Sequence, residues 1–259
     1  MTGKFSLNVA TILPADPEQK FYAAGQAGFR AVGLLLGDMA QAGEAGLMEL
    51  RLSQLAVSEL VSLSGWADPD RAARAVALAQ AERAFALAQE VRAEVVVASA
   101  PTRGESALAI SDRFRELCRL ADGYAVRIGL EFSGAGEGVK DIASAWTIVD
   151  TAGAENGGLV IDTFHYYQGN SRVEMLEPIP GDRIFLVQLA DCMEMPRYEL
   201  ENRHRVYPGE GAIPLEPLLA ALYEKGYEGY YSVELYNEDY WKEDPRVVAR
   251  DAMRSLRRL

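Results

Sequence analysis

The sequence predicts a single (β/α)8 (TIM) barrel that takes up the whole chain, residues 1–259. Eight short, continuously apolar runs alternate with longer amphipathic segments, as expected of parallel strands that are covered on both faces. The length suits one barrel of about 250 residues, and no Pro-rich linker, low-complexity stretch or long charge run divides the chain. An open, doubly wound sheet is the alternative, because alternation alone does not decide whether the sheet closes.

Each expected strand is a short run rich in β-branched residues and leucine. In chain order the runs are FSLNVA (5–10), AVGLLL (31–36), QLAVSELV (54–61), EVVVAS (94–99), RIGLEF (127–132), GLVIDT (158–163), IFLVQLAD (184–191) and YYSVEL (230–235).

The expected helices lie between these runs, at 17–28, 68–93, 106–124, 139–153, 213–227 and 244–259. Gly28 is a plausible C-cap for the first, and Asp68 or Asp70 is a start signal for the second. Pro214 and Pro245 are each expected just inside a helix start, where proline is tolerated.

Composition and charge exclude several classes of protein. The net charge is −12 and the pI is about 4.8, so the surface should repel the phosphate backbone of nucleic acids. No apolar run approaches the roughly 20 residues that a membrane helix needs, and the first 20 residues lack a signal-like apolar stretch. We therefore expect a cytoplasmic protein without nucleic-acid or membrane partners, and leave homo-oligomer formation open. Two cysteines, Cys118 and Cys192, cannot form a disulfide framework.

Polar residues stand at the ends of four consecutive expected strands, embedded among aliphatic ones. They are Glu131 in GLEF, Asp162 in VIDT, Gln188 in LVQLA and Glu234 in SVEL. The carboxyl ends of barrel strands form the active-site face, and buried carboxylates there would repel one another without a cation. Three carboxylates and one amide oxygen suit a hard divalent metal. One such acid alone is usually a helix cap or part of a salt bridge, but four consecutive strands favour a metal site.

Two further residues are candidates for substrate contact. His165 lies three residues after Asp162, and the near-neutral pKa of histidine suits proton transfer or hydrogen bonding to a substrate oxygen. Arg205 precedes the turn PGEG (208–211), whose glycines permit unusual backbone angles. Spacing alone leaves open whether this turn is an ordinary loop before a helix, with Asp191 and Glu210 orienting it, or aims Arg205 at the substrate.

These residues resemble the xylose-isomerase-like barrel superfamily of sugar epimerases, inosose isomerases and dehydratases, most strongly over 127–237. The resemblance implies one metal held by Glu131, Asp162, Gln188 and Glu234, with Mn²⁺ expected first and Mg²⁺ or Co²⁺ compatible. It also implies substrate contacts by His165, in the Asp-x-x-His motif, and by Arg205, before the Pro-Gly-x-Gly turn.

The resemblance implies proton abstraction next to a carbonyl of a small, carbohydrate-like substrate. Glu131 and Glu234 would be acid/base groups as well as ligands, and His165 would be a further acid or base. Return of the proton to carbon gives isomerisation or epimerisation, whereas loss of a β-hydroxyl gives dehydration. A barrel that binds metal and sugar without turnover is the non-catalytic alternative.

One departure from the family pattern concerns Gln188. Many epimerases of this group place histidine at that position, and glutamine in VQLAD looks like the bacterial 3-dehydroshikimate dehydratase branch. A keto-inositol dehydratase is a further alternative. Endonuclease IV shares the fold, but two histidines and a charge of −12 argue against a zinc-rich DNA repair enzyme.

Overall fold

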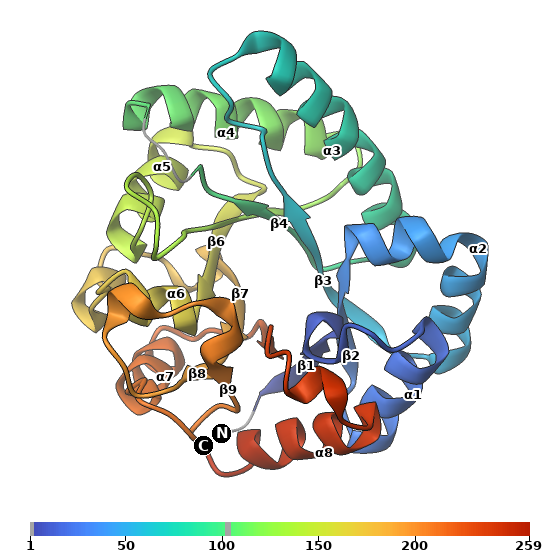
Figure 1. Cartoon of the computed structure of the whole chain (residues 1–259). Coiled ribbons are helices and arrows are strands. Elements are labelled where there is room, and N and C mark those ends of the chain that lie inside the picture. Colours follow the sequence, from blue (N-terminus) through green and yellow to red (C-terminus); the bar gives the residue numbers. More distant parts are fainter. Residues whose placement is uncertain (1–2, 102–104) are drawn as a thin grey trace.

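A computed structural model describes residues 3–101 and 105–259, which form a closed parallel barrel. The strand order around the barrel is β1-β10-β7-β6-β5-β4-β3-β2. Figure 1 shows the helices as an outer ring around these strands. The sheet is therefore closed, and the predicted (β/α)8 barrel is confirmed over the open-sheet alternative.

The barrel strands are β1 (Lys4–Asn8), β2 (Ala31–Leu35), β3 (Ala56–Leu63), β4 (Val95–Ser99), β5 (Ile128–Glu131), β6 (Gly157–Asp162), β7 (Ile184–Leu189) and β10 (Tyr230–Val233). The α-helices are α1 (Pro17–Ala27), α2 (Leu36–Ser53), α3 (Arg71–Val91), α4 (Ala107–Asp122), α5 (Ile142–Ala152), α6 (Thr163–Gln168), α7 (Leu215–Glu224) and α8 (Pro245–Leu256). Outside the barrel, β8 (Asp191–Cys192) and β9 (Arg205–Val206) form a short antiparallel pair.

Side-chain caps explain where several helices begin. Asp70 accepts a hydrogen bond from the amide of Ala73 at the start of α3, which decides between the two expected start residues. Pro245 is the first residue of α8, whereas Pro214 lies just before α7 rather than inside it. Gly28 ends α1 with φ 94°, a backbone conformation that favours glycine.

The sequence prediction omitted α2, α6 and the β8–β9 pair. Helix α2 follows β2 without a break, and no side chain caps its start at Leu35. Its sequence contains three glycines, and Gly43 has non-helical angles at a kink, so the periodic helical signal is weak there. Helix α6 has six residues and each strand of the pair has two, which is too short for a periodicity to appear.

The core has two apolar clusters. The larger one contacts both strands and surrounding helices, and it includes Cys118 and Cys192, which are free and buried. The smaller one fills part of the barrel interior and consists of Val61, Val95, Val97, Val160, Phe185 and Leu186. Gly129 lies against this inner cluster, where an added Cβ would come within 2.5 Å of Val160. The inner cluster supports the β4–β6 side of the barrel.

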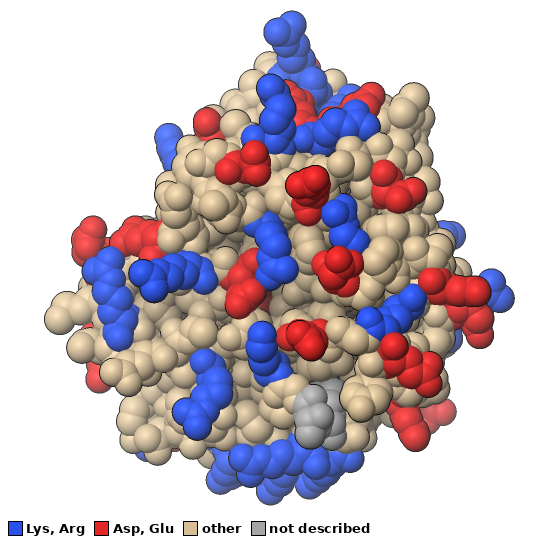
Figure 2. Space-filling model, turned by 180° about the vertical axis from the view of Figure 1, so that it is seen from behind, with Lys and Arg blue, Asp and Glu red and all other residues tan. Residues whose placement is uncertain are grey.

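Charged side chains of both signs are interspersed on the face shown in Figure 2, with a row of basic residues along the lower edge, where α8 lies. Several arginines of α8 pair with nearby acids, as Arg254 does with Asp251. Within the described ranges, no helix is long and apolar enough to cross a membrane.

Candidate metal centre

Four neighbouring strands bring the predicted ligands to one end of the barrel. Glu131 and Asp162 are the last residues of β5 and β6, Gln188 is the second-to-last residue of β7, and Glu234 directly follows β10. Asp162 and Gln188 are register partners on adjacent strands. All four side chains are buried, so their charges and dipoles interact in a poorly hydrated space.

Glu131, Asp162 and His165 form a compact cluster. Each offers one ligand atom, and these atoms all lie within 4.8 Å of one another. His165 was expected to contact substrate, and the structure places it directly beside two predicted metal ligands. The space between these three ligand atoms suits a small cation, with a substrate oxygen next to the cation.

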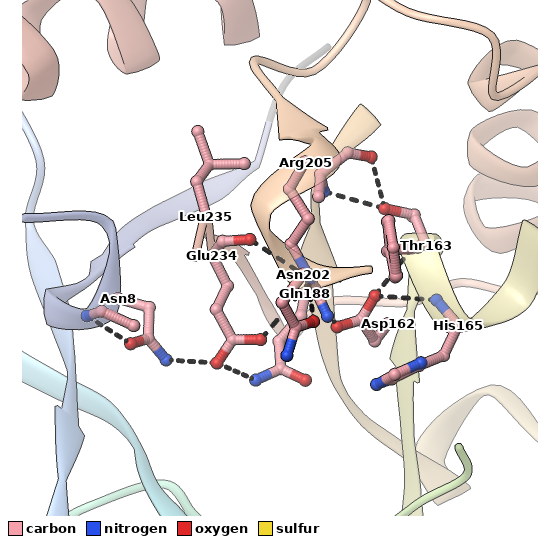
Figure 3. A network of polar contacts seen from close by, with 12 residues as sticks. Asn8, Asp162, Thr163, His165, Gln188, Asn202, Arg205, Glu234 and Leu235 are labelled. Atoms are coloured by element: carbon pink, nitrogen blue, oxygen red, sulfur yellow. Dashed lines mark hydrogen bonds and ion pairs between the residues drawn. The ribbon is translucent and has the colours of Figure 1, made fainter. Parts of the chain in front are cut away.

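Asp162 has a different partner on each oxygen. Its Oδ1 accepts the backbone amides of Phe164 at 2.7 Å and His165 at 3.1 Å, which caps α6. Its Oδ2 accepts a hydrogen bond from Nη1 of Arg205 at 2.8 Å. Figure 3 shows Arg205 lying between Asp162 and Glu234, and the same Nη1 is 3.7 Å from Oε2 of Glu234. Arg205 is thus a buried counter-ion to two predicted ligands in this structure, and its expected substrate contact stays a prediction.

Gln188 and Glu234 are joined directly. Nε2 of Gln188 donates to Oε1 of Glu234 at 2.9 Å, while Oε1 of Gln188 is buried without a hydrogen-bond partner. A buried amide oxygen without a partner is unfavourable by about 1–3 kcal/mol. A cation in front of it would supply the missing interaction, so this donor set fits a divalent metal.

His165 has one ring nitrogen engaged. Nδ1 accepts the backbone amide of Gly134 at 3.3 Å, so the neutral ring carries its proton on Nε2. Burial lowers the pKa of His165, which keeps the imidazole neutral. Gly134 is required there, because a Cβ would lie 2.7 Å from the carbonyl oxygen of His165. His165 can therefore donate a hydrogen bond from Nε2 to a substrate oxygen.

Burial and like charge perturb the carboxyl groups of the site. Burial, followed by the charge of Asp162, raises the pKa of Glu131 to about 8. Burial also raises the pKa of Glu234 well above its usual range, against the lowering effect of Arg205. For Asp162 burial acts upward, but Arg205 and His165 outweigh it and hold the pKa of Asp162 below its usual range. Ionising all three carboxyl groups would place more negative charge in this buried site than its one arginine balances, so two of the three have raised pKa values.

The loop that contains Arg205 is held by Asp191, as the sequence reading allowed. Oδ1 of Asp191 accepts the amides of Cys192 and Ile213, both at 2.8 Å, and Oδ2 accepts the amide of Gly209 at 3.1 Å. Gly211 leaves room for this contact, since a Cβ would lie 2.6 Å from Oδ1 of Asp191. Glu210 instead forms an exposed ion pair with Arg258.

Sequence reasoning missed two buried polar residues below the cluster, Asn8 on β1 and Glu59 on β3. Nδ2 of Asn8 donates to Oε1 of Glu59 and to Oε1 of Glu234, each at 3.0 Å. Burial raises the pKa of Glu59, although three side-chain hydrogen bonds act against it. Both residues interrupt apolar runs, in FSLNVA and AVSELV, which is the same signal that identified the four predicted ligands.

A family model described as the xylose isomerase-like TIM barrel matches residues 21–259. The chain belongs to this family. The resemblance inferred from the motifs is therefore confirmed.

Members of the xylose isomerase-like family that the chain resembles include enzymes of two kinds. Inosose isomerase of Bacillus subtilis is 36% identical over 148 residues, which are 57% of this chain and 52% of that protein. The 3-dehydroshikimate dehydratase of Pseudomonas aeruginosa is 34% identical over 185 residues, which are 69% of this chain and 29% of that protein. The chain thus spans about half the length of the first relative and under a third of the second.

Among solved structures, an IOLI protein with a bound zinc atom superposes with a TM-score of 0.91. It is 25% identical, and the match covers 98% of this chain and 96% of that one. The two relatives are enzymes of the isomerase and lyase types, and the zinc in this solved neighbour accords with the compact ligand cluster described above.

Proposed function

We propose that this chain is a divalent-metal-dependent isomerase or epimerase that abstracts a proton next to a carbonyl of a small polyhydroxy ketone. The observation that carries the proposal is the buried, partnerless Oε1 of Gln188, whose residue is the register partner of Asp162 and whose Nε2 contacts Glu234. Similarity to inosose isomerase makes a keto-inositol the first substrate to test.

Charge supports a divalent cation. Glu131, Asp162 and Glu234 in their ionised forms, beside the single guanidinium of Arg205, leave two negative charges in a buried site. The proposed ligands are these three carboxylates and the amide oxygen of Gln188. An all-oxygen donor set favours a hard cation, so we propose Mn²⁺ first, with Mg²⁺ or Co²⁺ next, although the solved neighbour holds zinc. When bound, such a cation acts as a Lewis acid on a carbonyl and a neighbouring hydroxyl.

The proposed roles of the side chains follow from their positions. Glu131 and Glu234 lie at the two ends of the arc β5-β6-β7-β10, so they can reach a substrate from opposite sides. One takes the proton from the carbon next to the carbonyl and the other returns a proton to carbon. His165 donates from Nε2 to a substrate oxygen. Arg205 balances Asp162 and Glu234, and contacts a substrate oxygen when one is present.

A 3-dehydroshikimate dehydratase-like lyase is the second candidate. Gln188, together with 34% identity to a dehydratase over 69% of the chain, favours it. In that reaction one of the same glutamates removes the proton from carbon, and His165 protonates the β-hydroxyl, which leaves as water. The product protocatechuate is aromatic and absorbs in the ultraviolet.

One pair of assays tests the proposal and separates the candidates. Mn²⁺-loaded protein is incubated with an inosose in D₂O and followed by NMR, and with 3-dehydroshikimate and followed by ultraviolet absorbance. We expect conversion of the inosose with deuterium entering at carbon, dependent on metal. Aromatisation without inosose conversion would establish the lyase instead. Mn²⁺ binding without either reaction, extended to a panel of ketoses, would support a non-catalytic binder.

A further inference from the structure

Glu59 is a fully buried carboxyl group that the proposed reaction does not use. It lies on β3 inside the barrel, and three polar side chains donate hydrogen bonds to it. Oε1 accepts hydrogen bonds from Oγ of Ser232 at 2.6 Å and from Nδ2 of Asn8 at 3.0 Å. Oε2 accepts a hydrogen bond from the hydroxyl of Ser58. Ser6 in turn is 2.5 Å from Ser58. A buried carboxyl group this well satisfied is an anchor for its neighbours.

Asn8 has no freedom to rotate its amide. Oδ1 accepts the backbone amide of Ala10 at 3.0 Å, and the two hydrogens of Nδ2 go separately to Glu59 and Glu234. A flipped amide would direct its oxygen at two carboxyl oxygens and lose all three bonds. Figure 3 shows Asn8 reaching Glu234 from the side opposite Arg205.

The fixed amide of Asn8 determines how the carboxyl group of Glu234 is oriented. Its Oε1 accepts two amide donors, from Asn8 and from Gln188. This fixes the plane of the carboxylate and leaves Oε2 directed toward Arg205, available to a cation or a substrate proton.

We propose that Asn8, anchored by Glu59, is a positioning residue that holds Glu234 with one oxygen free for metal and substrate. This inference rests on the proposed function, because it assigns a support to one of its acid/base groups. Gly33 leaves the space that Glu59 and Asn8 occupy, since a Cβ there would lie 2.0 Å from Oε1 of Glu59 and 3.0 Å from Nδ2 of Asn8. Outer-shell partners of this kind typically alter metal affinity or activity about 10- to 100-fold.

The test measures Mn²⁺ affinity by calorimetry, and kcat and KM of whichever reaction the chain catalyses. Asn8→Ser shortens the side chain but keeps a hydroxyl that can cap Ala10. We expect about a tenfold loss of Mn²⁺ affinity and about a 10- to 100-fold loss of kcat with little change in KM. Glu59→Leu should give the same pattern, whereas Glu59→Gln, which can still accept from Asn8, should restore near-wild-type values.

Ser6→Ala is the matched control, since it removes a buried hydroxyl of the same network away from Asn8. We expect its Mn²⁺ affinity and kcat to stay within about twofold of wild type. Glu234→Ala, measured for Mn²⁺ affinity alone, tests the proposed site itself. If Glu234→Ala weakens Mn²⁺ and Asn8→Ser does not, the positioning role is overturned and the site stands. If neither changes the affinity, the proposed site is wrong.

Discussion

Glu131 and Glu234 stand at the two ends of the same four-strand arc, but the barrel supports them in different ways. Beneath Glu131 lie Gly129 and the inner valines, and Ser99 forms a side-chain hydrogen bond with its carboxyl group. Beside Glu234, Asn8 and Gln188 donate to one carboxyl oxygen. Few groups fix the orientation of Glu131, whereas two amide donors hold Glu234 in one orientation.

The largest effects should come from neutralising each glutamate in turn. Glu131→Gln and Glu234→Gln should each lower kcat about 100- to 10,000-fold, as expected for loss of an acid/base group. Circular dichroism should show a retained fold, and steady-state kinetics measures the loss. Glu210→Gln, at an exposed ion pair, is the control and should leave kcat unchanged. Full activity in either site variant would remove that glutamate from the mechanism.

Removing the amide of Gln188 should affect the Glu234 side of the site. Gln188→Leu deletes the partnerless oxygen and one of the two donors to Glu234, so Mn²⁺ affinity should fall at least about tenfold. Gln188→His should retain metal binding and shift preference toward zinc, because imidazole is a softer ligand. Competition titrations with the two metals measure both effects. Unchanged Mn²⁺ affinity in Gln188→Leu would show that this oxygen is not a ligand.

The raised pKa of Glu131, at about 8, predicts how metal binding depends on pH. Protons and the cation compete for the carboxylate, so the apparent Mn²⁺ affinity should increase from about pH 6 to about pH 8, by up to about tenfold per pH unit for each proton displaced. Calorimetry at about pH 7 in two buffers of different ionisation enthalpy measures the protons released. Glu131→Gln should release fewer, and a pH-independent affinity would contradict the raised pKa.

The smallest effects should come from two glycine substitutions, one beneath Glu131 and one beside Asn8 and Glu59. Gly129→Ala crowds Val160 and Val95, so it should lower the free energy of unfolding by about 1–3 kcal/mol with little effect on Mn²⁺ affinity. Gly33→Ala displaces Glu59 and Asn8, so it should lower both quantities. Urea denaturation and metal titration of the two variants, side by side, measure the difference. Equal Mn²⁺ affinities would show that the polar support is not coupled to the metal site.

The strands could be predicted because each is a buried apolar run, and all eight lie where such runs occur. Helix α2 could not, because its glycines weaken the helical pattern and barrel packing must stabilise it. Asn8 and Glu59 could have been recognised from the sequence, because each is a polar residue in an apolar run. The hydrogen bond between them could not have been predicted from the sequence. The register between β2 and β3 shifts at Val32/Gly33, and this irregularity sets Glu59 rather than Ser58 opposite Gly33.

The sequence by itself determined the alternation of strands and helices and the four ligand-type side chains at strand ends, whereas closure of the sheet is seen only in the structure. It could do so because a polar group in a buried strand is unfavourable unless something binds it. Only the tertiary structure decided that Arg205 is the counter-ion of Asp162 and Glu234, that the amide oxygen of Gln188 lacks a partner, and that Asn8 links Glu59 to Glu234. These features depend on side-chain directions across strands as many as 226 residues apart in sequence, which no local pattern encodes.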